Sequence, residues 1–129
     1  MATIPARFEP SLLSLMRIAV AFVFVEHGTQ KLFAFPGPPI GALGSGLLLF
    51  TGVLETAGGT LLTLGLFTRI AAFLLSGEMA VGYWWMHAPV SLYPLLNGGE
   101  AMAVYSFVFL FLAAAGGGPF SLDAALKRA

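Results

Sequence analysis

Four long apolar stretches alternate with short polar or glycine- and proline-rich segments along the chain. They cover approximately residues 11–33, 41–66, 69–87 and 99–115. A helix rises about 1.5 Å per residue, so the first stretch is long enough to cross a bilayer core of ~30 Å. The pattern predicts an all-α integral membrane protein. We expect an antiparallel four-transmembrane-helix bundle, formed as a single transmembrane domain by residues 1–129.

The ends of the predicted helices carry clear local signals. Ser11 follows Pro10 and can cap the first helix. Residues 35–39, which read Phe-Pro-Gly-Pro-Pro, cannot continue that helix. Three glycines and Pro119 end the fourth helix, and residues 122–129 then form a short amphipathic C-terminal tail.

The composition supports the membrane assignment and excludes several function classes. Hydrophobic residues make up 58% of the chain, charged residues only 9%, and mean hydropathy is +0.91, whereas a soluble domain carries about a quarter charged residues. The net charge is zero and there is no basic tract, so the expected partner is the lipid bilayer and not nucleic acid. The chain has no cysteine, which excludes a thiolate nucleophile and a disulfide relay.

The basic residues predict the orientation of the bundle. With four helices, both termini lie on one side, and most basic residues fall on or near that side: Arg7, Arg17, Arg69, Lys127 and Arg128. Lys31 falls on the other side. The positive-inside rule then places both termini in the cytoplasm. Arg17 is expected to snorkel towards the cytoplasmic interface.

Six ionisable residues form the candidate ligand-binding or proton-relay site: His27, Lys31, Glu55, Glu78, His87 and Glu100. The predicted topology places all six between the midplane and the outer surface, and the cost of exposing them to lipid predicts one shared outer-half cavity. His27 and Lys31 share a helix face, and either Glu55 or Glu100 is the expected counter-ion. Two interpretations stay open: a structural ion pair that fixes helix register, or a ligand-binding or proton-relay site.

Aromatic residues and metal ligands complete the chemical inventory. Tyr83 and Trp84 lie at the same outer boundary and are candidate stacking surfaces for a ligand. Di-iron bundles use Glu-x-x-His pairs, and the chain contains none. A mononuclear site through His27 and His87 stays open, but no metal site is predicted.

Several motifs, taken together and in order, resemble the DoxX family of small four-helix bacterial membrane proteins. The motifs are Arg17, Glu26-His27-Gly28-x-x-Lys31-Leu32-Phe33, Glu55-x-x-Gly58-Gly59, Gly65-Leu66-Phe67-Thr68-Arg69, His87-Ala88-Pro89, Asn97-Gly98-Gly99-Glu100 and Gly118-Pro119-Phe120-Ser121-Leu122-Asp123. The resemblance implies a four-helix fold in the bacterial inner membrane. It implies an activity only loosely, because some members are linked to oxidoreductase assemblies, detoxification or quinone-linked sulfur oxidation.

Two functional hypotheses follow from the residues and the resemblance. In the first, the protein is a redox-associated subunit that binds a quinone or another small hydrophobic molecule and works with an oxidoreductase partner. In the second, it is a non-catalytic membrane scaffold, carrier or permeation element whose buried charges pin the helices. Glycine and threonine faces on the helices also predict a homo-oligomer.

Overall fold

The computed structural model describes residues 3–38 and 45–127, and its regular elements are helices. In chain order they are η1 (Ala6–Phe8), α1 (Glu9–Phe33), α2 (Gly46–Leu64), α3 (Thr68–Gly82), η2 (Tyr83–His87), α4 (Pro94–Asn97), α5 (Glu100–Ala115) and α6 (Leu122–Ala125). The described residues contain no strand, so the all-α class is confirmed. Residues 41–44, where the second helix was predicted to begin, lie outside the described residues.

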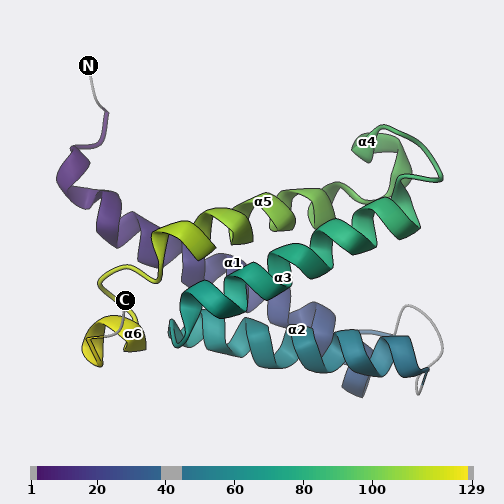
Figure 1. Cartoon of the computed structure of the whole chain (residues 1–129), viewed down its shortest axis with the longest axis horizontal. Coiled ribbons are helices and arrows are strands. Elements are labelled where there is room, and N and C mark those ends of the chain that lie inside the picture. Colours follow the sequence, from purple (N-terminus) through teal and green to yellow (C-terminus); the bar gives the residue numbers. More distant parts are fainter. Residues whose placement is uncertain (1–2, 39–44, 128–129) are drawn as a thin grey trace.

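The long helices pack in pairs. α1 lies mainly along α2, α3 lies mainly along α5, and α2 joins the two pairs through α3 (Figure 1). Both termini lie at one end of the molecule, together with α6, whereas η2 and α4 lie at the opposite end (Figure 1). We refer to these as the termini end and the loop end.

The observed helix boundaries differ in places from the predicted ones. The prediction that Ser11 caps the first helix is wrong, because α1 begins at Glu9, with Phe8 as its N-cap and Pro10 in its first turn. α2 begins after Ser45, whose hydroxyl accepts a hydrogen bond from the Leu48 amide at 3.2 Å. The third predicted helix is α3 followed directly by η2, a π-helical turn in which Ala88 N donates to Tyr83 O. The segment predicted as a polar loop before residue 99 contains the short helix α4.

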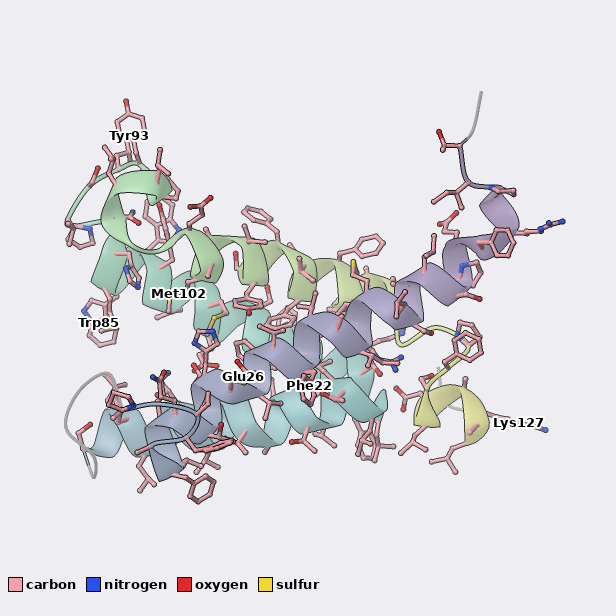
Figure 2. The ribbon with its side chains drawn as sticks, turned by 180° about the vertical axis from the view of Figure 1, so that it is seen from behind. Phe22, Glu26, Trp85, Tyr93, Met102 and Lys127 are labelled. Carbon is pink, nitrogen blue, oxygen red and sulfur yellow. The ribbon has the colours of Figure 1, made fainter. Side chains whose placement is uncertain are left out.

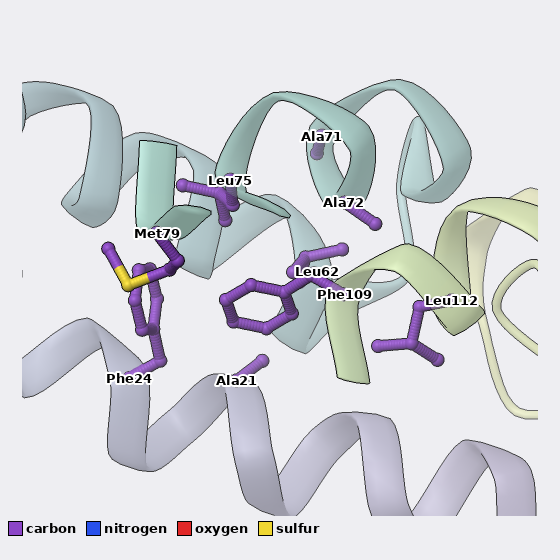
Figure 3. Packing of buried hydrophobic residues seen from close by; sticks show 9 residues of the cluster. All are labelled: Ala21, Phe24, Leu62, Ala71, Ala72, Leu75, Met79, Phe109 and Leu112. Carbon is purple, nitrogen blue, oxygen red and sulfur yellow. The ribbon is translucent and has the colours of Figure 1, made fainter. Parts of the chain in front are cut away.

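A compact apolar layer fills the interior between the helices (Figure 3). Its buried members are Ala21, Phe24, Leu62, Ala71, Ala72, Leu75, Met79, Phe109 and Leu112. Phe24 of α1 meets Phe109 of α5 edge-to-face, with ring centroids 4.8 Å apart. The layer therefore joins residues from all four long helices.

The outer surface of the helices is strongly apolar. Exposed fractions reach 65% for Phe22, 64% for Phe73 and 72% for Phe107, on three different helices. Among the described residues, two helices are long and apolar enough to cross a membrane, Ala6–Phe33 and Gly46–Leu64, and Glu100–Ala115 is apolar but shorter. Soluble monomers rarely expose contiguous apolar patches of more than a few hundred Å², so this surface fits a lipid environment.

Arg17 is buried at the termini end and does not snorkel, so that prediction is wrong. Its side chain is 1% exposed. The guanidinium donates to the carbonyl of Gly117, to that of Phe120 at 2.8 Å and to that of Thr63 at 3.5 Å. These three carbonyls match the planar, multi-donor shape of a guanidinium, which is why Arg17 is held inside.

The chain segment after α5 closes over this arginine, and we call residues 116–125 the C-terminal strap. Asp123 accepts hydrogen bonds from the amides of Phe67 and Thr68, both at 2.9 Å. Ser14 donates to the Gly117 carbonyl at 3.0 Å and accepts from the Phe120 amide at 3.1 Å. The strap is therefore bonded both to α1 and to the turn between α2 and α3.

Candidate functional site

A close approach of α1 and α2 positions the first two residues of the candidate site. Gly28 lies so near α2 that a Cβ atom there would be 2.5 Å from the backbone nitrogen of Thr56. Small residues let membrane helices approach in this way. Lys31 of α1 then reaches Glu55 of α2, with Nζ 2.7 Å from Oε1.

The Lys31–Glu55 ion pair is largely shielded from solvent. The Lys31 side chain is 21% exposed and that of Glu55 is 2% exposed. Of the two counter-ions that the sequence left open, the structure shows Glu55 as the one bonded to Lys31. Neither His87 nor Glu100 forms a salt bridge or hydrogen bond with this pair in the described part of the chain.

Glu78 brings a second carboxylate to the pair from α3. It interacts electrostatically with both Glu55 and Lys31. Both Glu78 oxygens and Oε2 of Glu55 are buried, and within residues 3–38 and 45–127 they meet no donor from a third residue, although the two carboxyl groups lie within reach of a hydrogen bond to each other. We call Lys31, Glu55 and Glu78 the polar triad. Burying a carboxyl oxygen without a hydrogen bond raises the free energy of the folded protein, so a hydrogen-bond donor at the triad would be stabilising.

An aromatic wall on α1 and α5 includes His27. The wall consists of Phe24, His27, Tyr105 and Phe109. Tyr105 meets His27 edge-on at 5.8 Å and stacks on Phe109 at 5.6 Å, both between centroids. His27 itself is exposed. Because His27 is one helical turn before Lys31 on α1, this wall adjoins the polar triad.

The predicted stacking residues lie elsewhere. Tyr83 is buried at the loop end, where its hydroxyl accepts a hydrogen bond from Asn97 at 3.1 Å. Trp84 is 65% exposed, and the neighbouring Trp85 and Tyr93 point away from the bundle at the loop end (Figure 2). Tyr105 is the aromatic residue that sequence reasoning missed. A tyrosine inside an otherwise apolar helix was the available signal.

The remaining candidates are organised around the loop end. His87 Nδ1 lies 3.0 Å from the Asn97 carbonyl oxygen, and the Asn97 side chain accepts from the Gly99 amide at 2.8 Å. Glu100 is exposed in the first turn of α5, where a carboxylate interacts favourably with the helix dipole. Glu26 is likewise exposed, on the face of α1 shown in Figure 2.

The six predicted site residues therefore divide into groups. Lys31, Glu55 and Glu78 are brought together, and His27 belongs to the adjacent aromatic wall. His87 is part of the loop-end hydrogen-bond network. Across the described ranges, no three His, Asp or Glu side chains converge in a way that could hold a metal ion.

Comparisons with known proteins agree with the sequence motifs. The DoxX family profile matches residues 12–88. An uncharacterized protein of Haemophilus influenzae is 43% identical over 123 residues, which cover 91% of this chain and 92% of the relative. The inner membrane protein YphA of Escherichia coli is 31% identical over 127 residues, covering 89% and 90% of the two chains. No solved structure matches.

Proposed function

The chain belongs to the DoxX family of membrane proteins, and from that premise we propose that it binds a small hydrophobic molecule of the quinone class as a redox-associated subunit of the bacterial inner membrane. The polar triad is the proposed binding point for the polar group of the ligand. The aromatic wall is the proposed surface for its ring.

The observation that carries this proposal is the unsatisfied hydrogen-bonding capacity of the triad. Glu78 offers two buried acceptor oxygens, and Lys31 carries three N–H donors, one of which points to Glu55. The reduced, quinol form of such a molecule would complement them, because its hydroxyl groups can donate to Glu78 and accept from Lys31, and Tyr105 offers a planar face nearby. Ligand sites commonly combine an apolar, aromatic lining with a few polar groups.

We further propose that four helical segments span the membrane. α1 and α2 have the necessary length, and α3 with η2 forms a helical stretch of comparable length, residues 68–87. α5 would be the fourth span, favoured by its apolar sequence. Both termini would be cytoplasmic, because Arg7, Arg69 and Lys127 belong to the termini end.

Ligand binding can be tested by thermal unfolding of the detergent-purified protein with two quinones, decylubiquinone and menadione, each kept in its reduced, hydroxyl-bearing form. We expect either quinone to raise the midpoint of the wild-type protein, because a ligand that binds only the folded state stabilises it. Glu78→Gln should reduce the increase, since an amide NH2 group replaces one of the two acceptor oxygens that the hydroxyl would meet. Glu9→Gln is the matched control, because it makes the same chemical change at an exposed position in the first turn of α1, far along the helix from the triad.

The second candidate function, a scaffold whose charges pin the helices, is favoured by the direct 2.7 Å bond between Lys31 and Glu55. It predicts that neither quinone shifts the midpoint of the wild-type protein. It also predicts that Glu78→Gln leaves the response to quinone unchanged. A shift that is equal in wild type and Glu78→Gln would place quinone binding away from the triad and refute the proposed site.

A further inference from the structure

Three layers follow one another along the bundle, from the loop end to the termini end. The polar triad comes first, at Lys31, Glu55 and Glu78. Apart from Met79, which is next to Glu78 on α3, the apolar layer of Figure 3 comes next, since Phe24 and Ala21 precede Lys31 on α1 by two and nearly three turns. The buried Arg17 and the C-terminal strap come last.

The apolar layer separates the triad from the termini end. Ala21, Leu62 and Leu75 have no exposed surface, and neither have Phe109 and Leu112. Interiors packed in this way leave few voids larger than a water molecule. Water and protons therefore have no polar path through this layer.

The strap holds the termini ends of the helices together beneath that layer. Arg17 binds carbonyls of both the strap and α2, and Asp123 binds the amides that begin α3. The amide of Asp123 also donates to the Gly65 carbonyl at 2.8 Å. Gly65 has a left-handed backbone, with φ of 69°, which suits glycine at this helix end. The strap is thus fixed to α1, to α2 and to the start of α3.

The triad lies close to the loop end, because Lys31 is two residues before the last residue of α1, Phe33. Lys31 retains 21% of its side-chain exposure, and Glu78 is half-buried. The triad is therefore partly exposed near the loop end and is bounded by the dense apolar layer on its termini side.

We propose that the C-terminal strap seals the termini end, so that the polar triad exchanges water, protons and its ligand with the loop side alone. The ligand part of this inference rests on the proposed function. The sealing part does not, because it concerns only access to the site. The protein would then be a one-sided binding protein and not a permeation element.

Thiol accessibility in sealed vesicles tests from which side of the membrane the triad is reached. Because the natural chain has no cysteine, each introduced cysteine is the only thiol that can react. Three single variants are needed: Glu78→Cys in the triad, Ser91→Cys as a loop-side reporter and Lys127→Cys as a termini-side reporter. A thiol reacts only as the thiolate, which requires water. With an impermeant methanethiosulfonate, we expect Glu78→Cys to react from the Ser91→Cys side and not from the Lys127→Cys side.

Reaction of Glu78→Cys from the Lys127→Cys side would overturn the one-sided arrangement. Failure to react from either side would also overturn it, because the triad would then be closed to the loop side. Neither result depends on quinone binding, so failure of this inference and failure of the proposed function are distinguishable.

The role of the strap is tested in the Glu78→Cys background. Arg17→Gln and, as a milder change, Asp123→Asn should allow reaction from the termini side, because each loosens the strap. Arg7→Gln is the matched control, since Arg7 is exposed at the same end and its guanidinium lies over the ring of Phe8. If folded Asp123→Asn protein remains as protected as the control, the strap is not the seal.

Discussion

Lys31 faces two carboxylates and is bonded to one of them, so its charge balances only part of the triad. Ion pairs buried in this way contribute little when compared with apolar replacements, but breaking one by removing a single partner is strongly destabilising. The triad is therefore a place where single and paired substitutions should behave very differently.

At the residue scale, we expect Lys31→Met to lower the free energy of unfolding by about 1–3 kcal/mol. This range lies between the values typical of exposed and of fully buried pairs, because Lys31 is partly exposed. Adding Glu55→Gln should restore part of the loss, since it removes a carboxylate that would be left without its cation. Denaturant unfolding in mild detergent measures the coupling.

Glu100→Gln provides the control for this double-mutant cycle. Glu100 is exposed at the start of α5 and forms no ion pair with Lys31 in the described residues. Its effect should add to that of Lys31→Met. If the effects of Lys31→Met and Glu55→Gln on the free energy of unfolding also simply add, the 2.7 Å contact between Lys31 and Glu55 contributes no net stability.

Arg17 supports a second prediction at the residue scale. Arg17→Lys should cost about 2–3 kcal/mol, because an ammonium cannot reach all three carbonyls and leaves buried acceptors unpaired. Arg69→Lys should cost much less, since Arg69 is exposed. The midpoints of thermal unfolding, compared at equal detergent concentration, check the difference. Equal losses would contradict the structural role of Arg17.

At the element scale, α1 and α2 can form the triad only because Gly28 lets them approach. Gly28→Ala should separate the helices, since its Cβ would meet the backbone of Thr56. We expect a loss of roughly 1–3 kcal/mol, as for other overpacked interiors. The loss should coincide with a weaker coupling between Lys31 and Glu55 in the double-mutant cycle.

Gly77→Ala is the matched change on α3. No atom lies within 4 Å of a Cβ at Gly77, and the residue is exposed in the middle of its helix. Alanine should therefore stabilise the protein by up to about 1 kcal/mol, through its higher helix propensity. Destabilisation at Gly77 that matched Gly28→Ala would show that the effect at Gly28 is not due to helix approach.

At the scale of the whole molecule, the proposed orientation predicts which end meets the outside of the cell. A cysteine at Pro38 or Ser91 should be labelled in intact cells by an impermeant thiol reagent, because both positions belong to the loop end. Lys127→Cys should be labelled only after lysis. The opposite result would invert the orientation and leave the fold unchanged.

The homo-oligomer and the oxidoreductase partner stay predictions at this same scale. The long helices expose large apolar side chains such as Phe73 and Phe107, which contact either lipid or another protein. The mass of the protein in nanodiscs would decide between a monomer and a homo-oligomer.

The sequence alone determined the class of the protein and the C-terminal ends of its first and last long helices, α1 and α5. The density of apolar residues required lipid around the chain, and breakers such as Pro36 and Pro119 follow the ends of helices. The motifs of the chain resemble those of the DoxX family, and the family profile confirmed that membership. These features depend on neighbours in the chain or on composition, which a sequence states directly.

Only the tertiary structure decided which residues meet. Helical periodicity places His27 and Lys31 on one face of α1 but does not say which helix lies opposite. Pairing α1 with α2 selected Glu55 as the partner of Lys31 and left Glu100 at the surface. The contact between α1 and α5 brought Tyr105 beside His27.

Arg17 shows the physical reason most clearly. An arginine near a predicted helix start has a nearby interface to reach, so snorkelling is the expectation from the chain alone. The strap, about a hundred residues later, instead supplies two carbonyl partners inside the fold. Contacts between residues so distant in the chain depend on how the helices pack, and they cannot be predicted from the local sequence.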